Sequence, residues 1–187
     1  CVGGSTTVNW TSSFRTPPAV LDYWQQALGL RTLNADALSA WFALIEHKLS
    51  IRLWETPPNA NNQALADGAG QLAIPVGAIR RNVKACWNLG YCGMGCPTNA
   101  KQSMLLTSIP AALQRGATLY SRLRAGRLRF AGSRVTALDC LALQPDGIRA
   151  SGIRVRLRAR HFVVAAGAIG SPALLLRSGV PDPPRLI

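Results

Sequence analysis

The feature that most constrains the fold is the segment HFVVAAGAIGSPALLLRSG, which runs from His161 to Gly179. Its first part, 161–165, is almost continuously apolar, as expected for a strand that is covered on both faces. A glycine-rich turn follows, then a helix over 172–177, and Gly179 supplies a stop. This order predicts a β-turn-α unit of an α/β fold. Such a turn suits a phosphate or ribose of a ligand, but it also occurs in many α/β folds without one.

Further strands are predicted upstream of that unit. Runs of strand-forming residues are separated by Gly, Pro and Asp turns, and they cover 118–121, 128–130, 135–143 and 153–157. The segment IRVRLRAR, from Ile153 to Arg160, alternates strictly between apolar residues and arginines. A period of two places the arginines on one face of a strand. That face is either solvated or covered by further chain.

The chain before these strands is predicted to be helix and loop. Apolar periodicity and the positions of Pro and Gly predict helices over 19–28, 33–54, 61–72 and 103–115. Asn34 or Asp36 is the expected cap of the second helix, and Pro110 is expected to kink the last one. A short extended piece is expected over 74–77. Residues 85–100 have no periodicity and are expected to form a loop.

Composition and charge narrow the class of protein. Apolar residues make up 48% of the 187 residues, enough for a hydrophobic core and too many for a disordered chain. Lys and Arg number 21 against 8 Asp and Glu, which gives a net charge of +13. This excess suits nucleic acid or an anionic membrane, yet no recognised nucleic-acid motif accompanies it, so no nucleic-acid partner is expected. No apolar run approaches the ~20 residues that span a bilayer, so no transmembrane segment is expected.

The five cysteines argue against a disulfide framework, because their number is odd. Three of them lie in CWNLGYCGMGC, between Cys86 and Cys96, with a C-x5-C-x3-C spacing. Zinc and most iron–sulfur sites need four ligands, commonly in C-x2-C pairs, and no His lies nearby. We therefore expect no metal site and interpret the segment as a compact turn of small residues. A reducing compartment, the cytoplasm, is favoured, and peripheral association with a membrane is left open.

Three segments, in this order, resemble the glucose–methanol–choline (GMC) family of flavoprotein oxidoreductases. They are GGSTTVN at 3–9, GCPTNAKQS at 95–103 and AAGAIGSPALLLRSG at 165–179. The cysteine-rich form of the middle segment is similar to the branch of long-chain alcohol oxidases and related bacterial dehydrogenases. The resemblance implies FAD as the cofactor. It also implies a mixed α/β fold: part of an FAD/NAD(P)-binding Rossmann-like domain with a substrate or cap domain, truncated at both ends.

The resemblance further implies where FAD would be contacted. In the family the first segment lies along the pyrophosphate and the isoalloxazine, and the third passes the adenosine half of FAD. A strand residue after the Gly-Ala pair contacts the adenine through its backbone, and alignment on Gly116 places it at Ala125. Close approach to an anionic ligand favours small residues at these positions. The predicted cofactor-binding residues are Gly4, Ser5, Thr6, Asn9, Ala125, Ala166 and Gly167.

No catalytic residue is expected within these 187 residues. Members of the family begin with a G-x-G-x-x-G unit and end with a catalytic His, and the sequence contains neither motif. His47 is expected on a helix and His161 at the start of a strand, and both are interpreted as structural or surface residues. Lys101, which opens a helix in the family, is expected to be solvated. The chain is thus expected to be the middle of a longer enzyme and to fold poorly alone.

The activity implied is oxidation of an alcohol at its CH–OH carbon by hydride transfer to FAD, with electrons passed on to oxygen or another acceptor. The alternatives are a noncatalytic remnant of such an enzyme, or a basic module that binds nucleic acid or an anionic membrane. A bulky or hydrophobic alcohol is expected, and Trp41, Phe42 and Trp54 would either line its pocket or form core. Residues 1–16 are expected to be a flavin-contacting loop, and 17–117 a helical insertion with part of the substrate or cap domain. Residues 118–187 are expected to be a strand-rich part of the FAD-binding domain.

Overall fold

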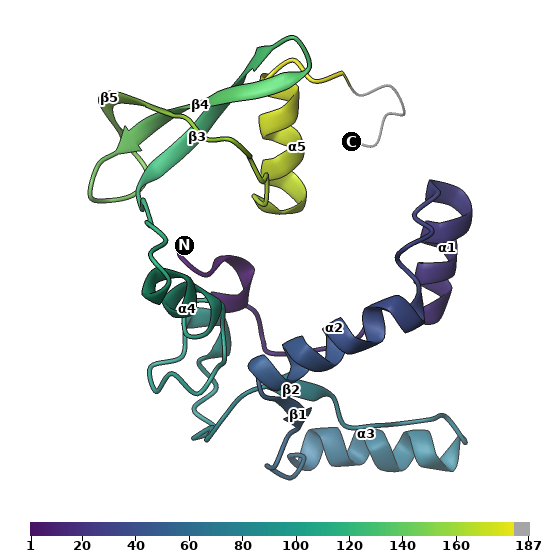
Figure 1. The fold of residues 1–187 in the computed structure, drawn as a ribbon. Coiled ribbons are helices and arrows are strands. Elements are labelled where there is room, and N and C mark those ends of the chain that lie inside the picture. The colour runs from purple at the N-terminus through teal and green to yellow at the C-terminus, as the bar shows by residue number, and fades with distance from the viewer. Residues whose placement is uncertain (182–187) are drawn as a thin grey trace. The chain divides into compact units, whose positions relative to one another are not determined.

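The computed structural model describes residues 1–181 and has a mixed α/β fold with two antiparallel sheets (Figure 1). The chain divides into two compact units, Cys1–Thr118 (unit 1) and the part that begins at Leu119 (unit 2). The predicted mixed α/β class is confirmed. Every strand pairing in the described residues is antiparallel, and each unit contains its own sheet.

Unit 1 combines helices with one small sheet. Its helices are α1 (Pro18–Leu28), α2 (Ala35–Lys48), α3 (Ala60–Gln71) and α4 (Ser108–Gln114), and its sheet pairs β1 (Ile51–Leu53) with β2 (Arg80–Asn82). Local signals set the helix ends. The side chain of Asn34 accepts a hydrogen bond from the backbone N–H of Ala37 at 2.8 Å, and Gly29 ends α1 with a φ of 68°. The helices predicted over 19–28 and 61–72 are confirmed.

The region after α2 differs from the prediction. The predicted helix over 33–54 is wrong at its end, because α2 stops at Lys48 and the chain continues into β1. Ser50 makes this turn with a positive φ of 51°, which a helix cannot contain. The extended piece predicted over 74–77 forms no strand. Pairing with β2, which lies far along the sequence, thus overrides the helical pattern around residue 51.

Helix α4 also begins later than predicted. It starts at Ser108 rather than Ser103, so Pro110 lies in its first turn. A proline is tolerated there, because the first N–H groups of a helix have no intrahelical partner. The predicted kink at Pro110 is therefore wrong. Gly116, with a φ of 86°, follows the helix as predicted.

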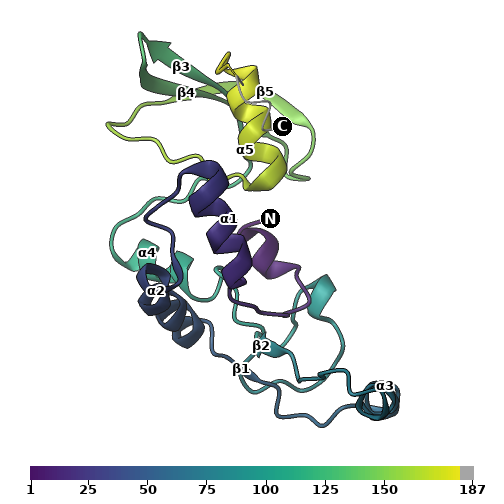
Figure 2. The same ribbon diagram turned by 90° about the vertical axis from the view of Figure 1, so that its right-hand side faces the viewer.

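Helix α3 is exposed around almost its whole circumference. Only Ala66 and Ala69 among its residues are partly covered, and Leu65 is 72% exposed. Figure 2 shows this helix end-on. Its N-terminus is capped by Asn59, whose side chain accepts from the backbone N–H of Asn62 at 2.9 Å. Local capping rather than packing defines this helix.

The buried residues of unit 1 are half apolar and half polar. Leu21, Leu49, Val83 and Ala100 are buried, and so are Thr11, Asn82, Lys101 and Ser103. The polar residues come from β2 and from segments that pair with it or with the residues just after it. The N–H of residue 84 donates to the carbonyl of residue 100, and the N–H of residue 102 donates to the carbonyl of residue 82, both at 2.8 Å. This pairing brings the middle motif into the centre of unit 1.

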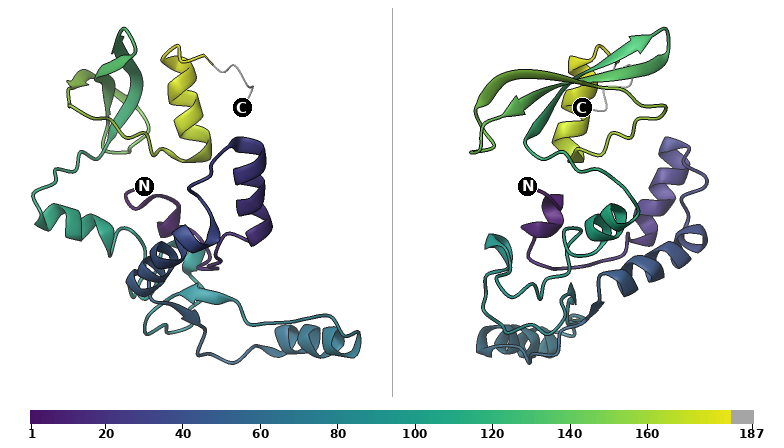
Figure 3. Two further views of the ribbon diagram at one scale, coloured as in Figure 1. Left: turned by 45° about the vertical axis from the view of Figure 1, so that its right-hand side comes forward. Right: turned by 60° about the vertical axis from the view of Figure 1, so that its left-hand side comes forward.

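Unit 2 consists of a three-stranded sheet and one helix. The strands are β3 (Leu123–Ala131), β4 (Arg134–Leu143) and β5 (Ala150–Leu157), in the spatial order β3-β4-β5. Helix α5 (Gly167–Arg177) packs against β3, as Figure 3 shows. Leu128 of β3, Cys140 of β4 and Leu174 of α5 are buried. The Ser178 hydroxyl accepts from the Leu128 N–H at 2.9 Å and so ties the end of the helix to the sheet.

The strands predicted over 128–130, 135–143 and 153–157 are confirmed within longer strands, but those over 118–121 and 161–165 are wrong. Val163, expected to be buried on both faces, is 90% exposed. A central strand needs neighbours to pair its backbone groups and cover its side chains, and no described segment does so at 161–165. No helix in residues 1–181 is long and apolar enough to cross a membrane.

Candidate functional site

The GGSTT segment forms a tight turn that requires glycine. Residues Gly4–Thr7 form a 3-10 helix. Gly3, which precedes it, has a φ of 92°, and Gly4, its first residue, has a φ of 59°. A Cβ at Gly3 would lie 2.3 Å from the Thr7 hydroxyl oxygen and 3.0 Å from the Leu105 Cβ. Gly3 therefore permits both the left-handed conformation and the close contact with the chain after the middle motif.

Thr6 connects the first motif to the middle one. Its hydroxyl donates to the Gly3 carbonyl at 2.6 Å and accepts from the backbone N–H of Met104 at 3.0 Å. The neighbouring Thr7 hydroxyl donates to the Val2 carbonyl at 3.1 Å. Gly4 and Ser5 lie on the exposed side of the turn. The two threonines thus hold the loop, and Gly4 and Ser5 present its open surface.

Lys101 is buried, which corrects the prediction that it is solvated. It is 3% exposed, and its ammonium group donates to three backbone carbonyls, those of Thr7, Asn9 and Cys92, the second at 3.1 Å. Burial lowers the pKa of this ammonium, although the nearby thiols of the cysteine loop oppose the shift. The Lys101 ammonium therefore joins the GGSTTVN loop to the cysteine-rich loop, with all three of its protons engaged.

Asn9 supplies an unsatisfied polar atom at the same place. Its backbone N–H donates to the Ser5 carbonyl at 2.9 Å, and its carbonyl accepts from Lys101. Its side-chain Oδ1 is buried and has no hydrogen-bond partner. A buried amide oxygen without a partner costs free energy of about 1–3 kcal/mol. Trp54 Nε1 is the other buried side-chain atom without a partner in residues 1–181. FAD carries N–H and O–H donors, which would satisfy the Asn9 oxygen.

An open pocket adjoins this loop within unit 1. Its volume is about 690 Å³, and its wall combines Thr7, Asn99, Lys101 and Ser103 with the apolar side chains of Tyr91, Met94, Leu105 and Leu106. Cys96 also lines it. Burial raises the pKa of the Cys96 thiol, but hydrogen bonds from the Thr98 hydroxyl and nearby backbone N–H groups outweigh this effect and lower it overall. The pocket is thus mainly apolar, with a few polar groups in its wall.

The cysteine-rich loop contains a short 3-10 helix, Cys92–Met94. A Cβ at Gly93 would lie 2.7 Å from the Trp10 ring, so the glycine allows this ring to contact the loop. All five cysteines are free. Within residues 1–181 no three His, Cys, Asp or Glu side chains gather in a way that could hold a metal ion.

The remaining predicted cofactor residues lie in unit 2. Ala125 is a half-buried residue of β3 opposite Cys140 of β4. Ala166 and Gly167 are exposed at the start of α5, where the Ala166 N–H donates to the Ser171 hydroxyl at 2.8 Å. Gly167 takes a φ of 81°. Gly4, Ser5, Thr6 and Asn9 thus come together in one loop of unit 1, and the other three residues belong to the sheet and helix of unit 2.

The two histidines, Trp41, Phe42 and Trp54 have the following surroundings in the structure. His47 is exposed in the last turn of α2, and His161 is exposed in the segment before α5. Trp41 is 63% exposed, and Trp54 stacks under the Arg81 guanidinium, 4.1 Å from the ring centre. Phe42 lines an open apolar pocket of about 380 Å³. These three aromatic side chains therefore do not form one surface.

Lys101 is the residue whose place sequence reasoning missed. A lysine at the expected start of a helix is normally solvated, but Ala100 and Ser103 on either side of it are also buried. These small residues next to the lysine are the feature of the sequence that could have indicated its burial. The carbonyls that surround the ammonium come from residues 7, 9 and 92, which local periodicity cannot bring together.

Comparison with known proteins places these motifs in a family. The family model for GMC oxidoreductases matches residues 1–185. An uncharacterised GMC-type oxidoreductase of Sinorhizobium fredii is 33% identical over 180 residues, which are 96% of this chain and 35% of that protein. One of Mycobacterium tuberculosis is 34% identical over 188 residues, 99% of this chain and 28% of that protein.

A more distant relative has a named activity. A long-chain-alcohol oxidase of Arabidopsis thaliana is 25% identical over 186 residues, which are 96% of this chain and 24% of that protein. The chain thus spans about a third or less of the length of the curated relatives it matches. Because the family model covers almost every residue, including all three motifs, the chain belongs to the GMC oxidoreductase family.

Proposed function

We propose that these residues form the central part of an FAD-dependent oxidoreductase that oxidises an alcohol at its CH–OH carbon. The observation that carries this proposal is the buried, unpartnered Oδ1 of Asn9 in a loop fixed by Lys101 and Thr6. Bound FAD would supply the hydride acceptor. Residues 1–16 and 118–187 would belong to the flavin-binding part, and 17–117 to the helical insertion and the substrate or cap domain.

Each predicted residue has a distinct task in this proposal. Asn9 accepts a hydrogen bond from the cofactor, while Gly4 and Ser5 offer an exposed backbone that an anionic group can approach closely. Thr6 holds the loop rather than the ligand, because its hydroxyl already has two protein partners. In unit 2 we assign Ala125, Ala166 and Gly167 to the adenosine half of FAD. Their small size leaves room for a ligand near the backbone.

The proton acceptor would come from outside these 187 residues. Both histidines are exposed, and neither makes a polar contact with the three motifs in the described residues. Neither is therefore assigned to proton transfer. The substrate we propose is a hydrophobic alcohol, supported by the name of the Arabidopsis relatives and by the apolar wall of the pocket next to Lys101. Oxygen is the favoured electron acceptor for the same reason, since those relatives are named oxidases.

The test uses the full-length protein. It is purified and its absorption spectrum recorded, and long-chain and short-chain alcohols are then added without oxygen. The proposal predicts the bands of an oxidised flavin, which bleach with the long-chain alcohol. A folded protein that stays colourless and takes up no FAD would instead support the alternative, a noncatalytic remnant of a GMC enzyme.

A further inference from the structure

One face of the unit 2 sheet is covered by arginines. In the register of β3, β4 and β5, Asp139 lies opposite Arg127 and Arg156, and Leu141 lies opposite Arg124 and Arg154. Residues opposite one another share a face, and so do residues two apart. Arg129, opposite Ala137, therefore completes the set. We call this the arginine face: Arg124, Arg127, Arg129, Arg154 and Arg156.

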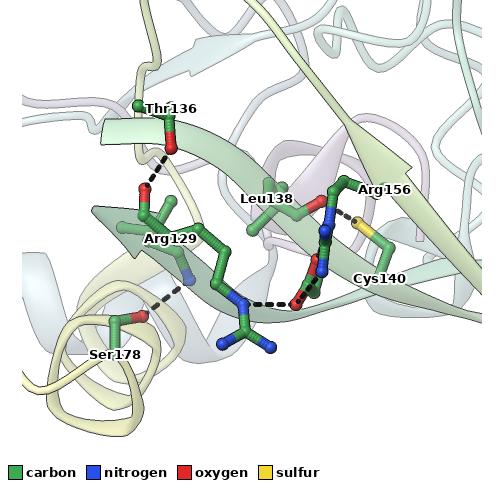
Figure 4. A network of polar contacts seen from close by, with 8 residues as sticks. Arg129, Thr136, Leu138, Cys140, Arg156 and Ser178 are labelled. Atoms are coloured by element: carbon green, nitrogen blue, oxygen red, sulfur yellow. Dashed lines mark hydrogen bonds and ion pairs between the residues drawn. The ribbon is translucent and has the colours of Figure 1, made fainter. Parts of the chain in front are cut away.

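A single carboxylate balances these five charges. Asp139 accepts from Arg129 Nε at 2.6 Å and from Arg156 Nε at 2.6 Å. Figure 4 labels these two arginines and draws their hydrogen bonds as dashed lines. Within residues 1–181, Arg127 and Arg154 have no carboxylate partner. The face therefore has a net positive charge, with two guanidinium groups free to bind an anion.

The same side chains form two neighbouring hollows. One, of about 460 Å³, is lined by Arg127, Arg129, Arg154 and Arg156 around Asp139. The other, of about 490 Å³, is lined by Arg129, Arg156 and Arg158 with Thr136. Guanidinium groups bind phosphate oxygens through paired hydrogen bonds. The hollows thus offer adjacent positions for phosphate groups.

An exposed isoleucine lies beside this charge. Ile148, in the turn between β4 and β5, is 72% exposed, and its carbonyl accepts from Arg124 at 2.8 Å, which holds the turn against the arginine face. At a membrane surface, cationic side chains contact the anionic headgroups while a neighbouring aliphatic side chain enters the boundary with the acyl chains, and both contacts favour binding. A nucleic acid offers the aliphatic side chain no such apolar phase.

We propose that the arginine face is a docking surface for a membrane that contains anionic phospholipid. The phosphate and carboxylate groups of the lipids would contact Arg127 and Arg154, and Ile148 would enter the headgroup region. This inference is independent of the proposed oxidoreductase activity, because it rests on unit 2 alone. It accounts for both the surface charge and the exposed Ile148 beside it, which neither a solvated strand face nor a nucleic-acid site explains.

The test is sedimentation of the full-length protein with vesicles. Vesicles of phosphatidylcholine alone are compared with vesicles in which about one third of the lipid is phosphatidylserine. The protein is expected to sediment with the second kind and to remain in solution with the first. Raising the salt concentration should weaken binding, because salt screens the charges. Equal binding to both vesicles, or no binding to either, would overturn the proposal.

Variants that lower or raise the positive charge of the arginine face test whether this face contacts the membrane. Arg127→Gln and Arg154→Gln should each weaken binding to the phosphatidylserine vesicles roughly fivefold. Asp139→Asn should strengthen it by a similar factor, because it releases two guanidinium groups. Arg31→Gln, an exposed arginine of unit 1, is the control and should change nothing. All four side chains are at the surface or replaced by a near-isostere, so the variants should keep the fold.

The competing partner is tested with a duplex DNA fragment. Ile148→Ser should weaken binding to the anionic vesicles and leave any weak binding to DNA unchanged, since only the membrane accepts the apolar side chain. Tighter binding to DNA than to the phosphatidylserine vesicles at the same salt concentration would replace the membrane with nucleic acid as the partner. Unchanged vesicle binding in Arg127→Gln and Arg154→Gln would place the membrane contact on another surface.

Discussion

Half of the buried residues in unit 1 are polar, whereas Ser178 is the one polar residue among those buried in the described part of unit 2. In unit 1 a lysine occupies the centre and is held by backbone carbonyls of two loops. In unit 2 Leu128, Cys140 and Leu174 form the centre, and the charges lie on the outer face of the sheet. The contrast indicates that unit 1 is organised to shape loops, and unit 2 to support a helix and a surface.

The motif residues follow the same contrast. In unit 1 the first and middle motifs are joined by Thr6 and Lys101, and Oδ1 of Asn9 in the first motif is buried without a partner. In unit 2 the third motif has an exposed start at Ala166 and Gly167, with Ile169 86% exposed. A preorganised loop costs a ligand little ordering entropy. We therefore expect substitution of the residues that hold the unit 1 loop, such as Gly3 and Lys101, to lower stability, and substitution of Asn9 to lower FAD affinity.

The largest effect is expected from Lys101→Met. The variant leaves three buried carbonyls without a donor, which should lower the free energy of unfolding by about 3 kcal/mol. Lys84→Met is the matched control, because Lys84 is exposed and two residues from the buried Asn82. Urea unfolding of the full-length proteins measures both. Equal unfolding midpoints for the two variants would mean that the buried lysine does not organise unit 1.

Substitution of two glycines with positive φ compares the cost of side-chain crowding with the cost of backbone strain alone. Gly3→Ala should destabilise by about 2 kcal/mol, because the new Cβ would meet Thr7 and Leu105 as well as an unfavourable φ. Gly167→Ala should cost only about 1 kcal/mol, because a Cβ added there would have no other atom within 4 Å.

The control for this pair is Gly68→Ala in α3. Its Cβ would meet nothing within 4 Å and its φ is not positive, so the substitution should stabilise the helix by about 0.5–1 kcal/mol. Urea midpoints again give the comparison. A larger loss for Gly167→Ala than for Gly3→Ala would contradict the view that the unit 1 loop is the more tightly packed of the two.

The smallest effect is expected on the charged face of unit 2. Hydrogen bonds from Arg156 and Arg129 lower the pKa of Asp139 to about 2. Because the folded-state pKa lies below the unfolded value, its contribution to stability is present above about pH 4 and is lost as the pH falls toward 2. The pairs are exposed, so salt screens them and the effect is small. Asp139→Asn should remove this part of the pH dependence of urea unfolding, and an unchanged pH profile would contradict the ion pairs.

The sequence predicted the local elements better than the long-range ones. The helix that ends at Gly29, the end of the helix before Gly116 and the alternating strand before Arg160 were confirmed. The strand over 161–165 was not, because its apolar pattern describes a burial that only neighbouring strands can provide. The helix over 33–54 ended early for a similar reason, since β1 depends on a partner at 80–82.

The candidate site was predicted in part. The motifs identified the loop that contains Gly4, Ser5, Thr6 and Asn9, and their roles toward FAD stay predictions. The burial of Lys101 could not be predicted, because its three acceptors come from separate parts of the chain. Nor did the spacing of the cysteines indicate that Gly93 lies against the Trp10 ring. These contacts belong to tertiary structure, which periodicity does not encode.

The most direct test of the account is the FAD affinity of Asn9→Ala in the full-length protein, measured by titrating the apoprotein. Because Oδ1 of Asn9 is buried without a protein partner, its loss should not lower the urea midpoint, while FAD affinity should fall about tenfold, the value of one hydrogen bond near 1.4 kcal/mol. Unchanged FAD affinity, with a midpoint that does not fall, would contradict the assignment of this loop to the cofactor.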